Sequence, residues 1–540
     1  MQHAETIFRG GRIITMSEAQ PAAEALAVGG GRIMAVGSPG EIEPLAGAAT
    51  RVVDLDGGVL LPGFIEAHGH PATEAIFTFP PATDVRPFFC ERYDDVIARI
   101  RERVRRATPG EFLFFRGLDA VLHRLPRDLT HEDLDGWAPD HPMVIQANSG
   151  HAAWANSAAL ARLGITRETP DPPGGHYLRD ASGRPTGKAT ELGVHAFLAP
   201  LMSRGMAEFR KSSLLALFGH YAQCGLTMAS DQGFVPENAD LYQAVAASGE
   251  SPVRIRAYVR GHHGSVPYER GEGDDTFRII GVKLTADGSP WVGNIAISDT
   301  YLNTDTTLKM MGLPADNRGD LNWSDDKLQE FIDTYGAQDW QLSVHAHGDL
   351  AIEQVLACYE KTLARSRGHD RRFRIEHCGA ITDAQITRAA GLGVLVSFFP
   401  AHVYWWGECM RHDLFKLSTA ERWMPMKSAE RAGMRISLHN DGMVTPTNPM
   451  LNIRTAVTRL TRAGNVLGPD QRISLDKALR AHTIDAAFQL FMDQETGSLE
   501  TGKSADVVWL ETDPYGSDPE RLHEIGVRGT WLRGKETFLA

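Results

Sequence analysis

The sequence predicts an α/β protein built around a (β/α)8 TIM barrel, with a small β-sandwich domain formed from both chain termini and a large insertion after the first barrel strand. Three observations favour this fold class. Strand-like apolar runs alternate with helical patterns through the middle of the chain, both ends are rich in short strands, and metal-ligand residue types recur where the apolar runs end. The chain has 540 residues, 42% hydrophobic and 23% charged, which is an ordinary globular composition with ample core for a buried site.

The two ends of the chain, residues 1–60 and 491–540, are predicted to fold together as one β-sandwich. Both show period-2 hydrophobic patterning interrupted by glycine turns. The N-terminal runs are TIFRGGRIITM, EALAVGGGRIMAVG and RVVDLDGGVLLPG, and the C-terminal runs are GSLETGKSADVVWLETDP and IGVRGTWLRGKETF.

The barrel itself is predicted to span residues 61–490. Its strand candidates are GFIEAHGH, GLTMASDQG, VRIRAYV, IIGVKLTADG, WQLSVHAHG, FRIEHCG, GVLVSFFP and MRISLHND, and helical patterns such as Asp349–Ser366 and Asp383–Gly391 separate most of them. The gap from Pro71 to about Arg210 is too long for one strand-to-helix connection. We therefore expect an insertion over about 75–210, with helices and strands of its own.

Charge and cysteine content narrow the class of protein. The net charge is −13, from 55 Lys and Arg against 68 Asp and Glu, and there is no basic run, so we expect a small-molecule substrate and no nucleic-acid partner. Five scattered cysteines without a CxxC pair, and the lack of an apolar leader, predict a cytoplasmic protein. No apolar run is long enough to predict a membrane span, and a homodimer stays open.

The run LLPGFIEAHGHP carries the clearest chemical signal, His68 and His70. In a β-strand this spacing puts both imidazoles on one face, where they form half of a divalent metal site. The alternative is a pair of solvated or core histidines. Further strand-like runs also end in ligand-type residues, and barrel enzymes build their sites at this end of the strands. These residues are Lys283, His345, His347, His377, His439 and Asp441.

Several motifs in a fixed order resemble the amidohydrolase superfamily, and within it the family-3, YtcJ-like branch that includes N-substituted formamide deformylase-like proteins. The motifs are PGFIEAHGH, SGHAAWANSAAL, GLTMASDQG, GVKLTADGS, VHAHGDLA, RIEHCGAI and the late Asp441. The resemblance implies that His68, His70 and Asp441 hold one metal ion and that His345 and His377 hold another, with Lys283 between them as a carboxylated, bridging ligand.

Histidine and carboxylate ligands suit Zn²⁺ best, as one or two ions per chain, with iron, manganese or nickel also possible. Lys283 becomes a ligand only after its amine is neutralised and captures carbon dioxide. The alternative for Lys283 is a structural ion pair with Asp287, which would leave a site for a single metal.

Other residues are candidates for supporting roles. His347 is expected to contact the substrate. Asp231 is expected to orient a ligand histidine. For His347 the alternative is a purely structural role, and for Asp231 it is a local turn or cap. His439, two residues before Asp441, is expected to lie behind the metal ligands and support them. The alternative is a packed barrel residue without a role in the site.

Two loops are candidates for substrate binding. Asn148 and His151, in SGHAAWANS and the residues before it, are expected to contact the substrate, unless they cap the following helix. Tyr404, Trp405 and Trp406, in FFPAHVYWWGECM, suit an apolar or aromatic substrate group, with packing or a subunit contact as the alternative.

The resemblance implies hydrolysis of a C–N, amide-type bond of a small molecule. Metal supplies hydroxide at neutral pH, and Asp441 takes the proton from the attacking water and passes it to the leaving amine. Hydrolysis of an ester, carbamate or lactone at the same site is one alternative, because metal hydroxide is not selective by itself. The second alternative is a barrel that binds a metal or a ligand without catalysing a reaction.

Overall fold

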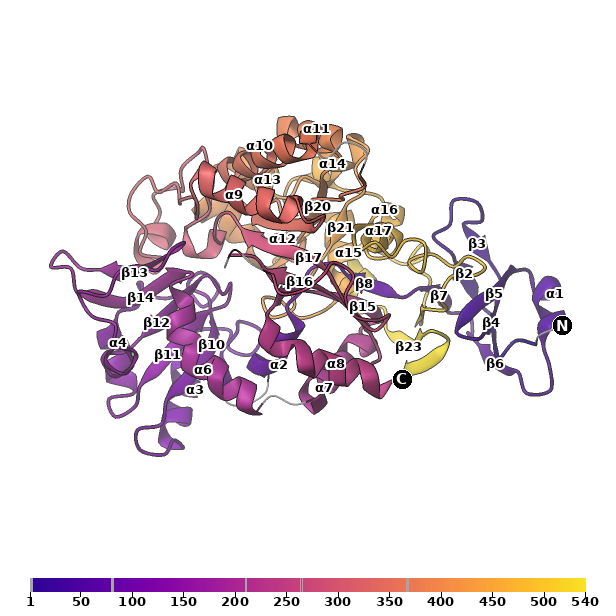
Figure 1. Cartoon of the computed structure of the whole chain (residues 1–540), viewed down its shortest axis with the longest axis horizontal. Helices are drawn as coiled ribbons and strands as arrows, with labels where there is room; N and C mark the ends of the chain where they lie inside the picture. The colour runs from indigo at the N-terminus through magenta and orange to yellow at the C-terminus, as the bar shows by residue number, and fades with distance from the viewer. Residues whose placement is uncertain (1–2, 79–81, 209–210, 263, 265, 366–368) are drawn as a thin grey trace.

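The computed structural model describes residues 3–78, 82–208, 211–262, 264, 266–365 and 369–540. The molecule has three parts in a row: a sandwich holding both chain ends, a central barrel, and an inserted α/β unit on the far side of the barrel (Figure 1). The predicted fold class is confirmed.

Eight parallel strands form the barrel wall in chain order. The strands are β8 (Phe64–Glu66), β15 (Leu226–Phe234), β16 (Arg254–Arg260), β17 (Phe277–Thr285), β18 (Gln341–Ala346), β19 (Arg374–His377), β20 (Leu395–Phe398) and β21 (Ser437–Leu438). Each overlaps one of the predicted strand runs, although β15, β16 and β17 extend one or two residues beyond them. The first strand, β8, and the last, β21, are not paired by backbone hydrogen bonds, and a side chain closes the barrel between them. Glu66 accepts hydrogen bonds from the backbone N and from Nδ2 of Asn440, at 2.8 and 2.6 Å.

These strands form because their residues are apolar and β-branched over continuous runs, as parallel strands buried on both faces require. Every residue of β15, β18, β19 and β20 is buried. Polar side chains within these runs are therefore held inside the barrel, where each needs a partner.

Helices cover the outside of the barrel in Figure 1. They include α7 (Lys211–Gln223), α8 (Ala239–Ser248), α9 (Asp325–Gly336), α10 (Asp349–Arg365), α11 (Asp383–Leu392), α12 (Ala401–Cys409), α14 (Met426–Arg431), α15 (Pro449–Thr458), α16 (Leu475–Ala481) and α17 (Ile484–Gln489). α9 illustrates their design: Leu328, Phe331, Ile332 and Tyr335 are buried at helical spacing, and the Ser324 side chain accepts from the N–H of Lys327 at its start. The predicted helices are α10 and α11; Ser366 lies outside the described residues.

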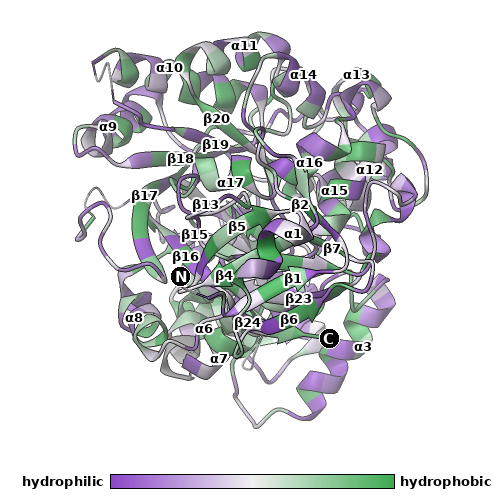
Figure 2. Ribbon diagram, turned by 90° about the vertical axis from the view of Figure 1, so that its right-hand side faces the viewer, coloured by the Kyte–Doolittle hydropathy of each residue, from purple (hydrophilic) through white to green (hydrophobic). Residues whose placement is uncertain are grey.

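The sandwich combines a four-stranded and a six-stranded sheet. Strands β1 (Thr6–Arg9), β4 (Ala25–Gly29), β5 (Arg32–Gly37) and β6 (Arg51–Asp54) form the first. The second holds β2 (Arg12–Ile14), β3 (Ala22–Ala23) and β7 (Val59–Pro62) together with the C-terminal β22 (Val507–Leu510), β23 (Val527–Leu532) and β24 (Lys535–Leu539). Phe8, Leu60, Val507 and Trp531 meet between them, and the strands that Figure 2 labels at this end are largely hydrophobic.

The insertion carries a sheet of its own, in the order β13-β14-β12-β11-β10-β9. Its strands are β9 (Ala82–Asp84), β10 (Leu113–Leu118), β11 (Met143–Ala147), β12 (Ala152–Ala155), β13 (Gly175–Arg179) and β14 (Pro185–Glu191), and its helices are α3 (Tyr93–Arg105), α4 (His131–Trp137), α5 (Ser157–Leu163) and α6 (Val194–Glu208). α2 (Pro71–Thr78) leads into it from β8. Residues 209 and 210, at its predicted end, lie outside the described residues.

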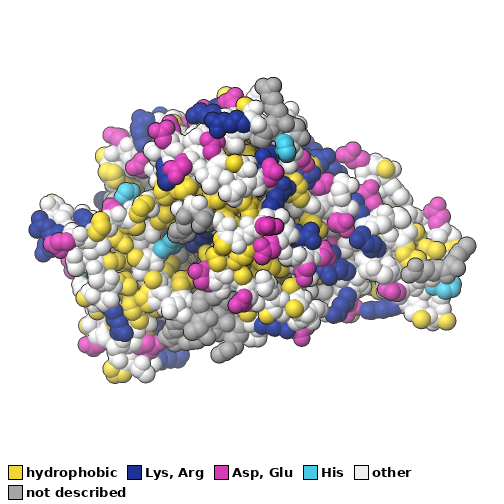
Figure 3. All heavy atoms as spheres, viewed as in Figure 1, with side chains coloured by type: hydrophobic (Ala, Val, Ile, Leu, Met, Phe, Trp, Pro, Cys, Tyr) yellow, Lys and Arg dark blue, Asp and Glu magenta, His cyan; other side chains and the backbone are white. Residues whose placement is uncertain are grey.

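The surface in Figure 3 mixes side chains of both charge signs, without one large patch of either. Within the part of the chain that the structure describes, none of the helices has both the length and the apolar character that a membrane crossing requires.

Candidate metal centre

The carboxyl ends of the barrel strands open into a cavity of about 160 Å³. All six predicted metal ligands line it: His68, His70, Lys283, His345, His377 and Asp441. They come from five strands, because the carboxyl ends of neighbouring parallel strands meet at one rim of a barrel. His68 and His70 follow β8 rather than lie in it, and the N–H of Gln232 in β15 donates to the carbonyl of Gly69 between them at 2.8 Å.

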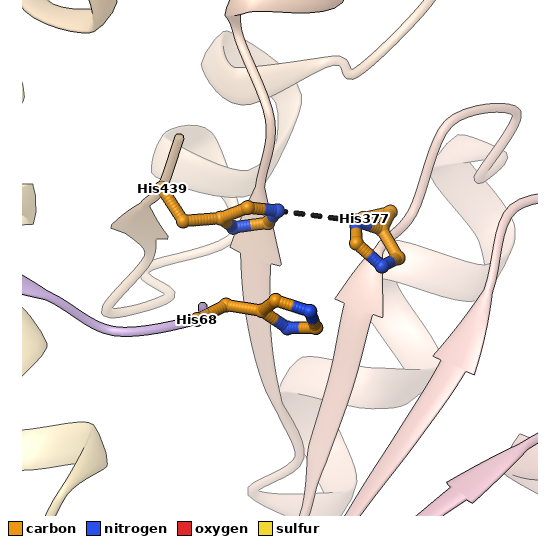
Figure 4. Close-up of side chains that lie close together, drawn as sticks. All are labelled: His68, His377 and His439. Carbon is orange, nitrogen blue, oxygen red and sulfur yellow. Dashed lines mark hydrogen bonds between the residues drawn. The ribbon is translucent and has the colours of Figure 1, made fainter. Parts of the chain in front are cut away.

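At and beneath this cavity, three groups of side chains each bring their ligand atoms within 4.8 Å of one another; His347 and His439 are members that do not line the cavity itself. The groups are His68, His70 and Asp441; His345, His347 and His377; and His68, His377 and His439. Figure 4 shows the last of these, with His68 below the pair of His377 and His439. The first group contains the three ligands that the resemblance implied for one ion. The second contains the two histidines implied for the other ion, together with His347.

His68 is held in place by a carboxylate. Its Nδ1 lies 2.7 Å from Oε2 of Glu376, so its Nε2 faces Oδ1 of Asp441 at 3.7 Å. Nε2 of His70 lies 3.3 Å from the same oxygen, but Oδ1 of Asp441 is buried without a hydrogen bond that meets geometric criteria. A carboxylate behind a histidine fixes which ring nitrogen is presented to a metal.

Glu376 is itself anchored below the cavity. Arg374 donates to both of its oxygens, at 2.8 and 3.0 Å, and Ser343 Oγ donates to Oε1 at 2.8 Å. Burial acts to raise the pKa of Glu376, but the charges of Arg374 and Lys283 outweigh it and hold that pKa below its usual value. Glu376 is therefore a fixed anion under His68.

The second group is linked to the eighth strand. Nδ1 of His377 lies 3.1 Å from Nε2 of His439, whose Nδ1 lies 2.8 Å from Oγ of Ser397. Nε2 of His345 lies 2.8 Å from the carbonyl oxygen of Gly288. His347 stacks on His377 with ring centroids 4.6 Å apart, and its Nδ1 has no partner among the described residues.

Burial keeps these histidines neutral. It lowers the pKa of each well below the ordinary value, and the repulsion that a further positive charge would meet inside the cluster adds to the effect. The residues concerned are His68, His345, His347, His377 and His439. Neutral imidazole is the form that binds a metal.

Lys283 projects from β17 into the same cavity. It is 6% exposed, and its Nζ is buried with no hydrogen-bond partner among the described residues. Burial lowers the pKa of Lys283 to about 8, so roughly a tenth of the amine is neutral at pH 7, far more than for an ordinary lysine. An unpaired buried amine is costly, which favours a functional role over a purely structural one.

The expected alternative, an ion pair between Lys283 and Asp287, is not formed. Oδ1 of Asp287 accepts from the N–H of His347 at 2.9 Å, and Oδ2 accepts from the N–H groups of Gly348 and Ala296, at 2.7 and 3.2 Å. Burial raises the pKa of Asp287 to about 7. Asp287 thus fixes the backbone after β18 and leaves Lys283 without a counter-ion.

The insertion places His151, but not Asn148, in the cavity. The ring of His151 lies 4.8 Å from that of His345, and its Nδ1 lies 3.0 Å from Glu191. Burial acts to lower the pKa of His151, but Glu191 outweighs it and raises that pKa. Asn148 instead donates to the carbonyl of Val444 at 3.1 Å outside this cavity. Neither caps the next helix, since Asn156 does so.

The aromatic residues after the seventh strand do not line the cavity. Trp406 is fully buried, stacks on Trp291 at 4.6 Å and donates its Nε1–H to Asp119 at 2.9 Å. Trp405 packs on Phe88, and Tyr404 lies under the guanidinium of Arg454. Tyr404, Trp405 and Trp406 are thus held by packing, because the chain enters α12 soon after β20, and their substrate contacts stay a prediction.

Asp231 does not reach a ligand histidine by a hydrogen bond. Its Oδ1 accepts from the N–H of Gly233 at 2.9 Å and its Oδ2 from the hydroxyl of Tyr242 at 2.7 Å. The expected alternative, a local turn, describes its position. The orienting carboxylate is Glu376, which the sequence signalled only as a charged pair, Arg374 and Glu376, on one face of a buried strand.

The donor set fits a divalent cation. Neutral imidazoles and a carboxylate converge from several strands, and Lys283 Nζ, His347 Nδ1 and Asp441 Oδ1 are buried without hydrogen-bond partners among the described residues. Nitrogen and oxygen ligands of this kind suit zinc and related transition metals.

A sequence model of the amidohydrolase family matches residues 51–538, which span the barrel, the insertion and the sandwich strands β6, β7 and β22 to β24. The chain belongs to the amidohydrolase family. This amidohydrolase is 29% identical to N-substituted formamide deformylase of Arthrobacter pascens over 99% of this chain and 98% of that protein. It is 27% identical to YtcJ of Bacillus subtilis (strain 168) over 99% of both chains. The predicted resemblance is confirmed.

Solved structures share its fold. The amidohydrolase superposes on an uncharacterized metal-dependent hydrolase from Pyrococcus horikoshii with a TM-score of 0.72 and 21% identity, over 95% of this chain and 99% of the other. An adenosine deaminase from Xanthomonas campestris with bound zinc gives a TM-score of 0.53 and 15% identity, over 100% of this chain and 94% of the other.

Proposed function

We propose that this amidohydrolase hydrolyses a C–N, amide-type bond of a small molecule at the barrel cavity, with a divalent metal as cofactor. The single observation that carries the proposal is the group of unpaired, buried polar atoms at the centre of a histidine cluster, Lys283 Nζ and Asp441 Oδ1 above all. Such atoms cost free energy in the unliganded protein unless binding satisfies them.

Asp441 is the proposed proton shuttle. Its Oδ1 faces the cavity between His68 and His70 and is already free to accept a proton. It takes a proton from the attacking water and delivers it to the nitrogen of the leaving amine, as general base and then general acid. A bound metal ion supplies the acidity that lets water attack at neutral pH and polarises the scissile carbonyl.

We further propose a two-metal site with zinc and a carboxylated Lys283. The first ion would use His68, His70 and Asp441, and the second His345 and His377. The neutral amine of Lys283 would form an N–C bond to carbon dioxide and release one proton to solvent, and the resulting carbamate would supply oxygen ligands in place of the amine. The Lys283 amine is buried and unpaired among the described residues, and its lowered pKa makes the neutral, reactive form more accessible, which supports this role.

The reaction class draws support from the relative in Arthrobacter pascens, which is named as a deformylase of N-substituted formamides. Formamides and other amides of small amines are therefore the first substrates to test. The proposal includes a small-molecule substrate, cytoplasmic location and no nucleic-acid or membrane partner, with homodimer formation open to measurement.

The test has two steps. Elemental analysis of protein purified without chelator should give more than one transition-metal ion per chain, and a value near one would favour the mononuclear form. A panel of amides, esters, carbamates and lactones is then assayed with and without chelator. Chelator-sensitive release of amines supports the proposal. Less than one metal per chain with no gain on reconstitution would overturn it, and turnover of esters alone would reassign the bond.

A further inference from the structure

The cavity holds one cation besides Lys283. Among the described residues that line it, the side chains with a full charge are Arg260, Lys283, Glu191 and Asp441. Glu191 is occupied, since it bonds His151 and accepts from Nδ2 of Asn322 at 3.2 Å. Arg260 ends β16 and is half-buried at the cavity wall, in register with Lys283 on the next strand.

Arg260 has no carboxylate within 4.0 Å among the described residues. Its guanidinium contacts a neighbouring histidine, with Nη1 lying 3.4 Å from Nε2 of His195. Other arginines inside this protein are compensated: Arg374 by Glu376, Arg254 by Asp275 and Asp506, and Arg459 by three backbone carbonyls. The Arg260 fork therefore retains donors that face a cavity open to a ligand.

The guanidinium lies beside the metal-site histidines. The position that a Cβ of Gly233 would take is 3.4 Å from Nη2 of Arg260 and 2.8 Å from Nδ1 of His70. Only a glycine leaves room for both groups to meet above β15. An anion bound by Arg260 would thus lie close to whatever bond is cleaved at the ligand cluster.

We propose that Arg260 binds a carboxylate of the substrate, so that the substrate class of this enzyme is N-acylated or N-formylated amino acids and similar amides with a nearby carboxylate. The inference rests on the proposed amide hydrolysis. Arginine presents parallel N–H donors that match the two oxygens of a carboxylate, so it recognises that group by both charge and shape.

Burial sharpens this recognition. The Arg260 pKa is lowered by burial and raised in part by the charge of Asp231, which does not form an ion pair with it. A partly desolvated guanidinium that lacks a direct counter-ion gains more from an incoming anion than a fully solvated one does. A neutral amide of the same shape would leave that charge unpaired in the closed complex.

The first experiment compares matched substrates on the metal-loaded enzyme. N-formyl and N-acetyl derivatives of alanine, leucine and phenylalanine, in both configurations, are assayed beside their primary carboxamides. We expect kcat/KM for the carboxylates to exceed that for the carboxamides by about 10- to 100-fold. Arg260→Gln should bring the ratio near one with metal content unchanged, and Arg260→Lys should keep part of the preference.

Arg106→Gln is the matched control, because it removes the same charge from an exposed position just after α3, far along the chain from the cavity residues. It should leave the ratio as in the unmodified enzyme. An unmodified enzyme without preference for carboxylates would overturn the proposal. The proposal would also be overturned if Arg260→Gln lost metal but kept its preference for carboxylates. Arg260 would then support the metal ligands near Lys283 and would not bind the substrate.

A second measurement separates this proposal from the amide reaction. Levulinate is the ketone isostere of N-acetylglycine and has no C–N bond to cleave. Calorimetry with the metal-loaded protein should show levulinate binding at least about tenfold more tightly than levulinamide, and the difference should vanish in Arg260→Gln. If no amide in the panel is hydrolysed but this difference holds, the anion site stands and the proposed reaction fails. Equal binding of the two probes overturns the anion site.

Discussion

Lys188 in the inserted sheet and Lys283 in the barrel are equally buried, each 6% exposed, yet their surroundings differ. Nζ of Lys188 donates to Oδ2 of Asp128 at 2.7 Å and to the carbonyl of Met311 at 3.3 Å, and lies 5.3 Å from the Trp154 ring centroid. Nζ of Lys283 has none of these partners, although it lies among histidines and carboxylates.

The difference separates a charge that stabilises the fold from one kept available for chemistry. A buried charge is tolerated when it is paired and hydrogen-bonded, and removing one partner of such a pair costs stability. A buried amine without a partner lowers stability, and the protein keeps it only where it serves a function. The predictions below test this contrast from the largest expected effect to the smallest.

The largest effect is expected at Asp441. Asp441→Asn removes the proton acceptor, so kcat should fall by about 10²–10⁴-fold while substrate binding changes far less. His439→Gln is the control, since His439 follows the same strand but is bonded to His377 and Ser397. Steady-state kinetics with metal analysis decide the matter. Equal loss in both variants, with Asp441→Asn still metal-loaded, would assign the proton transfer elsewhere.

Lys283→Ala comes next. If Lys283 is carboxylated, the variant should lose metal and activity together, and short carboxylic acids should restore part of both by filling the bridging position. Its stability without metal should stay within about 1 kcal/mol of the unmodified chain, since no ion pair is broken. Metal content, turnover and chemical denaturation are measured. Full metal content and near-normal turnover would show that the lysine is structural.

Glu376→Gln tests the orientation of His68. The change weakens the bond to Nδ1 of His68 and leaves Arg374 without its anion. We expect about 10- to 100-fold lower metal affinity or activity, as for other partners of metal-binding histidines. Ser343→Ala is the milder control, because it removes one donor to Glu376 and keeps the charge. Metal titration and steady-state kinetics measure metal affinity and activity in both variants. Unchanged metal affinity in Glu376→Gln would show that Glu376 does not orient His68.

Lys188→Ala should give the opposite pattern to Lys283→Ala. It leaves Asp128 unpaired at the junction of the insertion and the barrel, and Asp128 is 21% exposed, so we expect a loss of about 3 kcal/mol, at the low end for buried pairs. Metal content and kcat, measured well below the melting temperature, should change by less than about threefold. A loss of kcat without a loss of stability would contradict the contrast between the two lysines.

Trp406→Phe is expected to have the smallest effect. It removes the donor to Asp119 and leaves a buried carboxylate oxygen unsatisfied, which costs about 1–3 kcal/mol. Because Trp406 lies outside the cavity, KM should not change. Thermal unfolding and kinetics test this, and a raised KM at unchanged stability would return Trp406 to the substrate site.

The sequence predicted the fold class, the barrel strands and the gathering of the six ligand candidates because each rests on local patterns. Continuous apolar runs mark parallel strands, and ligand-type residues at their ends meet wherever such strands close a barrel. The positions of His68 and Asp441 in one cavity follow from this rule alone, without any knowledge of which residues pair across the barrel.

The supporting residues could not be predicted in the same way. Glu376 meets His68 across 308 positions of sequence, and no local pattern encodes that pairing. Tyr404, Trp405 and Trp406 looked like strand-end residues, but a helix turns about 100° per residue and sends neighbouring side chains in different directions. Only the structure shows that α12 begins at Ala401 and directs Trp406 into the core.

The sandwich ties the last part of the chain to the first, and this fixes when the protein can be completed. β7 pairs with β22, residue Leu61 opposite Val508, so one edge of β7 has its partner only after nearly the whole chain has been made. At ordinary rates of synthesis that interval is on the order of tens of seconds. During it, residues 59–62 present an apolar, unpaired strand edge, the kind of surface that captures a second chain. Nascent chains of this enzyme are thus most exposed to misassociation at the end that emerged first.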